Sequence, residues 1–380
     1  MSFRTKNEEE SRNKISQSPK KAHFEMTTET YKMKNFNINN LIRENIKSLQ
    51  PYSSARDEYK DATSTEMVFL DANENPFQNG VNRYPDPQQN SVKDLLSEIK
   101  SVSTKNILLG NGSDEVLDLI FRAFCEPNQD NIITLPPTYG MYSVLTNINA
   151  IENRKVILTE DFQPQVNQIL EAADNNSKIL FLCSPNNPSG NSFSVGKVEE
   201  LLTKFNGLVV IDEAYIDFSE QKSWLEKLND YPNLIITQTL SKAYGLAGIR
   251  LGVCYASQEI ISVLNNIKSP YNVNELTQQR AIERLSKMGE VQSEIAEIIT
   301  QRQLLIENLK SVSFIQNIYP TDCNFVLVKV DDATKRYKQL IEKGIVIRNR
   351  TTQPLCENCL RFTVGSQIEN TKLLNALKEL

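Results

Sequence analysis

One stretch decides the fold expected for this chain: Thr239-Leu240-Ser241-Lys242-Ala243-Tyr244-Gly245-Leu246-Ala247-Gly248-Ile249-Arg250-Leu251-Gly252. It follows an apolar run at 234–237 that is typical of a buried parallel strand. Lys242 therefore stands at the exit of a strand, among hydroxyl-bearing and small residues. A lysine in such a crowded, mostly uncharged turn loses its proton more easily and can attack a carbonyl. The alternative is a lysine that only borders a core strand.

Length and composition limit the classes of protein that fit. With 380 residues, 39% of them hydrophobic, the chain is long enough for one large or two medium domains with a real core. The net charge of −5 provides no broad basic field, so nucleic acid is not an expected partner. No apolar run approaches the length that crosses a bilayer, and the N-terminus lacks the apolar core of a signal peptide. A membrane is therefore not an expected partner either.

The cysteines and the single histidine limit which kinds of catalytic site, metal site and disulfide can be expected. Six cysteines in scattered contexts fit reduced thiols in the cytoplasm better than a disulfide framework. Cys356 and Cys359 have CxxC spacing without a second pair or a histidine, and we interpret them as loop residues rather than zinc or redox groups. His23 lies in a polar N-terminal segment, which argues against a Ser-His-Asp triad, a Cys-His pair and a histidine-rich metal site. No metal is expected, and Lys242 becomes the candidate for proton transfer.

The patterning divides the chain into a tail, an arm and two domains. Polar, non-periodic composition predicts a disordered tail or non-native extension first. Apolar residues from Ile38 to Leu49 then fall on one helical face, and a long helical pattern covers 274–309. The expected parts are the tail at 1–34, an N-terminal arm and helix joining the small domain at 35–66, a large cofactor-binding domain at 67–273 and a small C-terminal domain at 274–380.

Short apolar runs alternate with helical lengths, which predicts an α/β fold with a mainly parallel sheet flanked by helices, plus a smaller α+β domain. In the large domain the strands are expected at 67–70, 107–109, 131–135, 178–183, 207–211, 234–237 and 249–254. In the small domain they are expected at 324–328, 344–347 and 360–365. Because ligands bind outside the carboxyl ends of parallel strands, the residues that follow these runs are the candidate site.

Polar groups follow the strands in an order that suits one kind of ligand. They are Gly112 and Ser113 at a turn into a helix, then Asn187, Asp212, Tyr215, Lys242 and Arg250. A helix N-terminus offers unpaired amides to an anion, and Asp114 would contribute its amide because its carboxylate would repel phosphate. A phosphate-bearing aldehyde cofactor would use the whole set: a lysine for the imine, a carboxylate for the pyridine nitrogen and an arginine for the phosphate. Singly, each has a structural alternative, such as a helix cap for Asp212 or a turn former for Asn187.

Several motifs resemble those of the fold-type-I pyridoxal-phosphate aminotransferases: Pro-Asn-Asn-Pro-Ser-Gly at 185–190, Asp-Glu-Ala-Tyr at 212–215 and the segment 241–250 around Lys242. More narrowly, the chain resembles the histidinol-phosphate aminotransferase family in segments 70–76, 83–87, 110–115, 137–142 and 360–365. The likeness extends from about Ile38 to the C-terminus. Ser189 is a departure, because the family often has threonine there.

The resemblance implies pyridoxal 5′-phosphate as the cofactor. Lys242 would be the Schiff-base lysine and the base that moves the substrate proton. Asp212 would pair with the pyridinium, with Tyr215 and Asn187 at the ring oxygen, and Tyr139 would stack on the ring. The residues implied around the phosphate are Gly112, Ser113, Asp114, Thr239, Ser241 and Arg250.

The resemblance also implies a homodimer with shared active sites, in which Tyr84 reaches the cofactor of the partner subunit. Arg361 would receive the anionic group of the substrate, and Arg348 matches a position that helps to bind the substrate phosphate. Arg350 lies two residues further on, so the choice between these two arginines stays open. The implied substrate-binding residues are Tyr52, Asn187, Arg348 and Arg361.

The reaction implied by the resemblance is transamination of L-histidinol phosphate with 2-oxoglutarate, which gives imidazole acetol phosphate and L-glutamate, as in histidine biosynthesis. Two alternatives use the same scaffold, an aminotransferase for aromatic amino acids and a decarboxylase that resembles threonine-phosphate decarboxylase. A third alternative is a cofactor-binding regulator without turnover. The complete set of Lys242, Asp212 and Tyr215, and the lack of a DNA-binding element, argue against the regulator.

Overall fold

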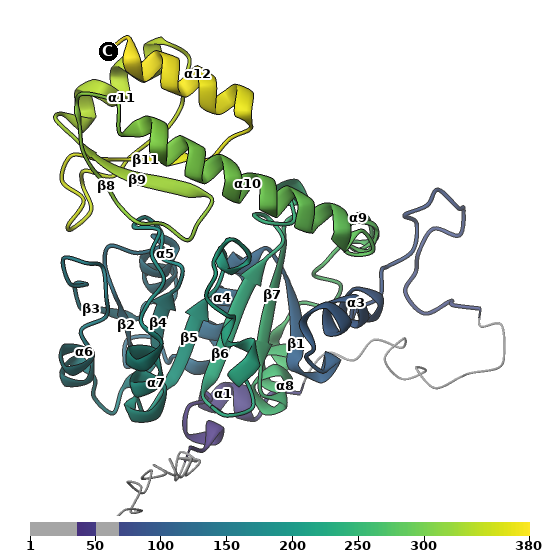
Figure 1. The fold of residues 1–380 in the computed structure, drawn as a ribbon. Helices are drawn as coiled ribbons and strands as arrows, with labels where there is room; N and C mark the ends of the chain where they lie inside the picture. Colours follow the sequence, from purple (N-terminus) through teal and green to yellow (C-terminus); the bar gives the residue numbers. More distant parts are fainter. Residues whose placement is uncertain (1–35, 51–67) are drawn as a thin grey trace, which may run out of the picture. The chain divides into compact units, whose positions relative to one another are not determined.

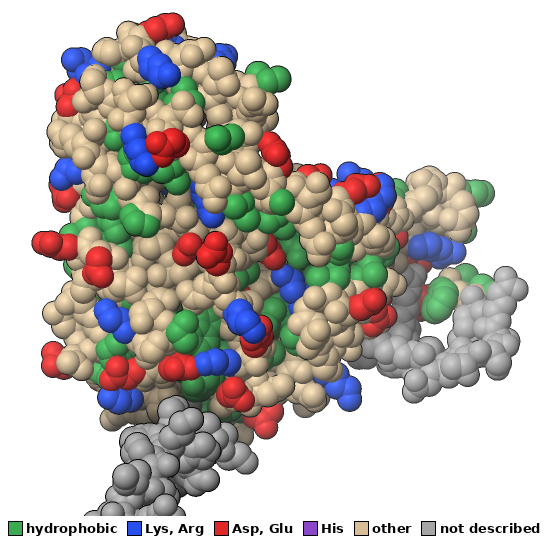
Figure 2. All heavy atoms as spheres, viewed as in Figure 1, with side chains coloured by type: hydrophobic (Ala, Val, Ile, Leu, Met, Phe, Trp, Pro, Cys, Tyr) green, Lys and Arg blue, Asp and Glu red, His purple; other side chains and the backbone are tan. Residues whose placement is uncertain are grey.

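The structure is a computed structural model that describes residues 36–50 and 68–380. The tail expected at 1–34 and most of the arm, including Tyr52, lie outside these residues. Within the described ranges, none of the helices combines the length and the apolarity that crossing a bilayer requires. On the face drawn in Figure 2, basic and acidic side chains are interspersed rather than gathered into one patch.

A seven-stranded sheet carries the candidate site (Figure 1). Its strands are β1 (Ile107–Asn111), β2 (Asn131–Thr134), β3 (Glu152–Lys155), β4 (Ser177–Cys183), β5 (Leu208–Asp212), β6 (Leu234–Thr239) and β7 (Leu251–Ala256). They lie in the order β1-β7-β6-β5-β4-β2-β3. β7 is antiparallel to β1 and β6, whereas the other neighbours pair in parallel. The prediction of a mainly parallel α/β sheet is confirmed.

Helices cover both faces of this sheet, because its central strands are apolar on both sides. Every residue of β5 and β6 is buried. One face packs on α4 (Ser113–Phe124), α5 (Met141–Ile148) and α8 (Gln258–Ile267). The opposite face packs on α3 (Asn90–Lys100), α6 (Val166–Ala172) and α7 (Val195–Lys204). The polar side chains at the strand ends are therefore held by a rigid three-layer core.

A four-stranded antiparallel sheet forms the C-terminal part, in the order β10-β11-β9-β8. Its elements are β8 (Ile315–Ile318), β9 (Phe325–Val330), α11 (Ala333–Glu342), β10 (Arg348–Asn349), β11 (Cys359–Thr363) and α12 (Gln367–Lys378). They follow α9 (Glu275–Leu285) and α10 (Met288–Leu309). One face of the sheet buries apolar residues against α10, α11 and α12. This is the smaller α+β part that the sequence predicts, while the boundary after residue 273 stays a prediction.

The N-terminal segment differs from the single helix expected after Ile38. Its described part contains η1 (Ile38–Asn40) and α1 (Glu44–Lys47), two short elements with Arg43 between them as the N-cap of α1. The backbone amide of Arg43 donates to the Ala123 carbonyl at 3.1 Å, and its guanidinium pairs with Glu126 at 3.2 Å. Residues 36–50 therefore pack at the end of α4, not on the small domain as expected.

Three other expectations need correction. Residues 68–70 form no strand, and Val68 and Leu70 are 79% and 87% exposed, so their apolar pattern marks a surface rather than a core. The strand expected at 344–347 is replaced by β10, two residues long. The helix expected over 274–309 is two helices, because the backbone leaves the helical conformation at Lys287, with φ −117° and ψ 44°, between the end of α9 and the start of α10 at Met288.

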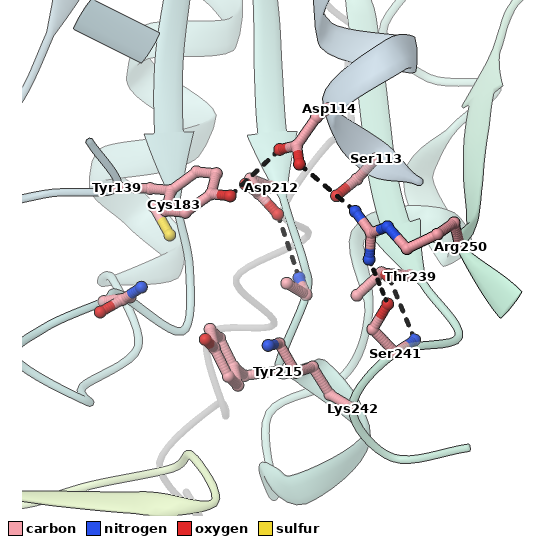
Figure 3. Close-up of a pocket in the computed structure, with 12 residues that line it drawn as sticks. Ser113, Asp114, Tyr139, Cys183, Asp212, Tyr215, Thr239, Ser241, Lys242 and Arg250 are labelled. Atoms are coloured by element: carbon pink, nitrogen blue, oxygen red, sulfur yellow. Dashed lines mark hydrogen bonds and ion pairs between the residues drawn. The ribbon is translucent and has the colours of Figure 1, made fainter. Parts of the chain in front are cut away.

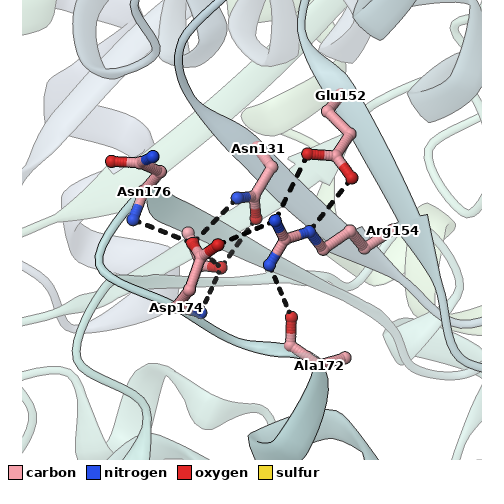
Figure 4. Close-up of polar contacts among 7 residues, drawn as sticks. Asn131, Glu152, Arg154, Ala172, Asp174 and Asn176 are labelled. Atoms are coloured by element: carbon pink, nitrogen blue, oxygen red, sulfur yellow. Dashed lines mark hydrogen bonds and ion pairs between the residues drawn. The ribbon is translucent and has the colours of Figure 1, made fainter.

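The edge strand β3 was not expected, because its sequence Glu-Asn-Arg-Lys has no apolar alternation. Arg154 fixes it through a polar network (Figure 4). Its guanidinium pairs with Glu152 at 3.1 Å and Asp174 at 2.7 Å and donates to the Ala172 carbonyl at 2.9 Å. Hydrogen bonding by Asn131, followed by Arg154, lowers the pKa of Asp174 to about 2. Charge and side-chain hydrogen bonds thus hold this edge strand.

The remaining short helices lie in the connections. They are η2 (Thr104–Asn106), η3 (Ile216–Phe218), η4 (Trp224–Lys227) and η5 (Ala247–Ile249). Two of them flank the candidate site, because η3 follows Tyr215 and η5 precedes Arg250.

Candidate active site

A pocket lies where β5 and β6 end and α4 begins (Figure 3). Most of the residues implied for the cofactor come together here, although they are spread over more than a hundred positions of the chain. The lining residues are Ser113, Asp114, Tyr139, Cys183, Asn187, Asp212, Ala214, Tyr215, Thr239, Ser241, Lys242 and Arg250. The carboxyl ends of neighbouring strands meet at one edge of the sheet, which explains why these groups converge.

Lys242 projects into the pocket from the turn after β6, and its amine points toward Tyr215 (Figure 3). Nζ lies 5.8 Å from the centroid of the Tyr215 ring. The turn is closed by the Gly245 amide, which donates to the Lys242 carbonyl at 3.1 Å. Partial burial, followed by the positive charges of Arg361 and Arg250, lowers the pKa of the Lys242 amine. This lysine is therefore closer to its neutral, nucleophilic form than an ordinary surface lysine.

Asp212 forms the buried end of the pocket. It is the last residue of β5 and only 4% exposed. Its Oδ2 accepts a 2.8 Å hydrogen bond from the Tyr142 hydroxyl, and its Oδ1 accepts one from the Ala214 amide at 3.2 Å. Burial raises the pKa of Asp212 to about 6. A carboxylate with so little water and no ion-pair partner among the described residues favours a ligand that brings a positive charge to it.

The N-terminus of α4 and Arg250 form a cradle for an anion. Gly112 caps the helix with a φ of +80°, and a Cβ there would lie 2.6 Å from Nη2 of Arg250. Gly252 lets β7 approach the same turn, since a Cβ would lie 2.2 Å from the Ser113 nitrogen. Arg250 also donates to the Ser241 hydroxyl at 3.4 Å. Free helix amides, a hydroxyl and a guanidinium thus face one small space.

The Asp114 carboxylate lies beside this cradle but is held by two donors. The Tyr139 hydroxyl donates to its Oδ1 at 3.0 Å, and Arg250 approaches its Oδ2 at 3.5 Å. Burial, followed by the charge of Asp114, raises the pKa of Tyr139, so this phenol stays a donor. The Tyr139 ring meets the Tyr142 ring edge-on, with centroids 5.7 Å apart. The repulsion expected between Asp114 and a phosphate is therefore offset by these contacts.

The opposite side of the pocket receives a cation from the small sheet. Arg361 of β11 donates to Oδ1 of Asn187, and its guanidinium lies 4.8 Å from the centroid of the Phe325 ring. Phe325 in turn meets Tyr215 edge-on at 5.2 Å. Arg348 is the direct cross-strand neighbour of Arg361 and is exposed. The geometry thus offers a site for an anionic group next to the lysine.

Comparison with known proteins identifies the scaffold. Residues 55–378 match the family described as aminotransferase class I and II. This chain belongs to that family of aminotransferases. A histidinol-phosphate aminotransferase from Flavobacterium johnsoniae is 70% identical to it over 348 residues, which cover 92% of this chain and 100% of that protein. One from Bacteroides thetaiotaomicron is 53% identical over 342 residues, covering 90% and 98%.

A solved structure supports the same fold for the aminotransferase. The histidinol-phosphate aminotransferase from Sinorhizobium meliloti, in complex with pyridoxal-5′-phosphate, is similar with a TM-score of 0.73 and 25% sequence identity. The similarity covers 78% of this chain and 82% of that one. The predicted fold-type-I architecture is thereby confirmed.

Four described residues implied for the site of the aminotransferase are not among those that line the pocket: Gly112, Tyr84, Arg348 and Arg361. Tyr84 is half exposed and stacks on Tyr271, with ring centroids 4.5 Å apart. It lines a separate hollow with neighbours such as Glu74 and Leu276. Tyr52 lies outside the described residues.

Sequence reasoning missed Tyr142, which contacts Asp212 directly. Tyr142 lies in the first turn of α5, and its ring is fully buried against Phe181, with centroids 4.6 Å apart. A buried tyrosine needs a hydrogen-bond partner for its hydroxyl, and that requirement is the signal that could have found it. The aminotransferase thus holds its pocket carboxylate through a residue of α5 as well as through the strand itself.

Proposed function

We propose that this aminotransferase transfers the amino group of L-histidinol phosphate to 2-oxoglutarate, forming 3-(imidazol-4-yl)-2-oxopropyl phosphate and L-glutamate in histidine biosynthesis. The relatives that are 70% and 53% identical carry the name of this activity. The observation that carries the proposal is that Lys242 and Asp212 line one pocket while Arg361 contacts Asn187 of the same lining, because amino transfer between anionic substrates needs a base, a charge partner for a cofactor and an anion receptor.

The residues fit pyridoxal 5′-phosphate at both ends of the pocket. The cradle beside Gly112 is open because glycine has no side chain, and any Cβ there would collide with Arg250. The donors around it suit a phosphate. At the other end, the buried Asp212 suits a protonated pyridine nitrogen. When bound, the cofactor supplies a carbonyl for covalent attachment and a ring that accepts electrons from the substrate carbon.

The side chains of the chain itself then have distinct tasks. Lys242 attaches the cofactor and moves the proton at the substrate carbon, which its lowered pKa favours. Asp212 would keep the ring nitrogen of the cofactor protonated, and Tyr215 and Asn187 would donate hydrogen bonds to the ring oxygen. The phosphate is assigned to Gly112, Ser113, Asp114 through its amide, Thr239, Ser241 and Arg250.

The substrate is assigned to the side of the pocket near the small sheet. Arg361 receives the carboxylate of glutamate or the anionic group of the other substrate, since a guanidinium fork suits both. Arg348 and Tyr52 are assigned to the substrate phosphate, and Tyr139 to the face of the cofactor ring. The order in which the two substrates react follows a ping-pong scheme, because one pocket must serve both.

We also propose a homodimer with shared sites, in which Tyr84 reaches the cofactor of the partner subunit. The segment around Tyr84 exposes large apolar side chains: Val68, Leu70 and Phe77 are 79%, 87% and 79% exposed. Exposed apolar clusters of this kind favour a protein partner. We place the enzyme in the cytoplasm, since all six cysteines are free and buried. Residues 67–273 and 274–380 are proposed as its large and small domains.

Two experiments test the function. In single-turnover assays of the loaded enzyme, L-histidinol phosphate should exceed phenylalanine, tyrosine and O-phosphothreonine in kcat/KM. A higher value for phenylalanine or tyrosine would make the substrate wrong while the aminotransferase class stands. Borohydride reduction and peptide mass spectrometry should find the cofactor on Lys242, and Lys242→Ala should carry none; a label on another lysine would refute the assignment.

A further inference from the structure

Three arginines of the small sheet share one face. Arg348 and Arg361 are direct partners in the antiparallel pairing of β10 and β11, so their side chains point to the same side. Arg350 follows two positions after Arg348, and its amide continues the ladder by donating to the Cys359 carbonyl at 2.8 Å. Alternation along an extended strand puts Arg350 on that side as well. Because Arg361 on this face reaches Asn187, the face is turned toward the pocket.

The charge of these arginines is not balanced by the described part of the chain. Within residues 36–50 and 68–380, no ion pair joins any of the three to a carboxylate. The Nε atoms of Arg350 and Arg361 are buried without a hydrogen-bond partner. Burial, followed by the charges of Arg361 and Arg348, lowers the pKa of Arg350 to about 10. Such a cluster costs stability unless a ligand supplies negative charge.

We propose that Arg350 is a specificity-determining residue that, together with Arg348 and Arg361, selects the doubly charged phosphate of a substrate over a singly charged carboxylate. The inference rests on the proposed function and deepens it. It also resolves the choice between Arg348 and Arg350, since both take part.

The chemistry follows from charge and shape. One guanidinium is enough to neutralise a carboxylate, and Arg361 fills that role. A phosphate monoester carries close to two negative charges above its second pKa of about 6 and has three acceptor oxygens. A second and a third guanidinium can therefore form further hydrogen bonds with a phosphate, whereas a carboxylate has too few acceptor oxygens to use all of them. Loss of Arg350 should weaken the phosphate ligand much more than the carboxylate ligand.

The test measures binding by calorimetry on the cofactor-loaded enzyme with two unreactive probes, glycerol 3-phosphate and the monocarboxylate butyrate. Arg350→Gln should lower the affinity for glycerol 3-phosphate by about 10- to 100-fold and the affinity for butyrate by less than about threefold. Arg350→Lys keeps the charge without the fork and should fall between the wild type and Arg350→Gln. Lys338→Gln removes an exposed charge from α11 and should change neither affinity. Thermal unfolding checks that each variant is folded.

The pH dependence gives a second readout. Affinity of the wild type for glycerol 3-phosphate should rise as pH passes about 6, where the second proton leaves the phosphate, and Arg350→Gln should flatten this rise. Equal losses for both probes, or no loss for the phosphate, would overturn the role of Arg350. The substrate proposal fails separately, if wild-type enzyme does not prefer L-histidinol phosphate in the single-turnover comparison.

Discussion

The hydroxyl of Tyr142 donates a 2.8 Å hydrogen bond to Oδ2 of Asp212 at the buried end of the pocket. This bond lowers the pKa of Asp212, against the larger effect of burial, which raises it. It also fixes the orientation of the carboxylate that we assign to the cofactor nitrogen. The tyrosine acts through Asp212 and is therefore a positioning residue.

Replacing Tyr142 by phenylalanine should weaken cofactor binding by about tenfold, because a charged acceptor loses one hydrogen bond. The dissociation constant of pyridoxal 5′-phosphate, measured by fluorescence, checks this. Tyr337→Phe on α11 is the matched control, since Tyr337 is partly buried and packs against the apolar core of the small sheet. An unchanged constant in Tyr142→Phe would show that the strand alone holds Asp212.

Asp212→Asn should stabilise the cofactor-free protein while it weakens cofactor binding. The folded state raises the pKa of Asp212 from 3.8 to about 6, so the native carboxyl binds its proton more tightly than the unfolded one. Native stability therefore falls as pH rises through this window. At pH 8 the variant should exceed the wild type in unfolding free energy by about 3 kcal/mol, and at pH 5 by roughly half as much. Denaturant titrations at both pH values measure the difference, and a gap independent of pH would contradict it.

Gly252→Ala should damage the anion cradle. Its Cβ would lie 2.2 Å from the Ser113 nitrogen and 2.4 Å from the Gly112 carbonyl carbon, so the turn before α4 has to move. We expect a loss of about 1–3 kcal/mol in stability and at least tenfold weaker cofactor binding. Gly196→Ala is the control, because a Cβ there meets nothing within 4 Å. Equal behaviour of the two variants in denaturation and cofactor titration would refute the packing argument.

The exposed apolar segment should determine the oligomeric state. Leu70→Asp places a charge on a side chain that is 87% exposed and should shift the protein toward monomers in sedimentation velocity. Ile368→Asp on α12 changes a side chain that is 83% exposed outside this segment and should leave the distribution unchanged. A monomeric wild type, or a fully dimeric Leu70→Asp, would place the interface elsewhere or remove it.

Much of the site could be predicted because its residues end apolar strands. Asp212 terminates β5 and Lys242 follows β6, and parallel strands bring such ends together without further information. Tyr142 could not be placed this way, since its bond crosses from α5 to β5 and depends on how the helix packs. The joint position of Arg348, Arg350 and Arg361 depends on the register of two short strands, which local patterning does not specify.

The strands could be predicted from the sequence where they are buried, and the prediction was wrong for exposed segments. The buried strands of the large sheet carry apolar runs that reveal them. β3 is a polar edge strand held by Arg154, and residues 68–70 are apolar but exposed, so each reverses the usual link between apolar pattern and strand. The helical pattern over 274–309 is interrupted at Lys287, whose backbone leaves the helical conformation, and hydrophobic periodicity does not report such a local change.

The position of β7 has a consequence for how the chain acquires its ligand. Among the described strands, β1 pairs with β7 alone, although more than a hundred residues separate them. Strand β1, which leads into the turn at Gly112, therefore cannot join the sheet until β7 has been synthesised and inserted. Contacts of such high sequence separation form slowly. A chain that ends before Leu251 lacks part of the cradle. Only chains that have completed the large sheet should therefore bind the cofactor.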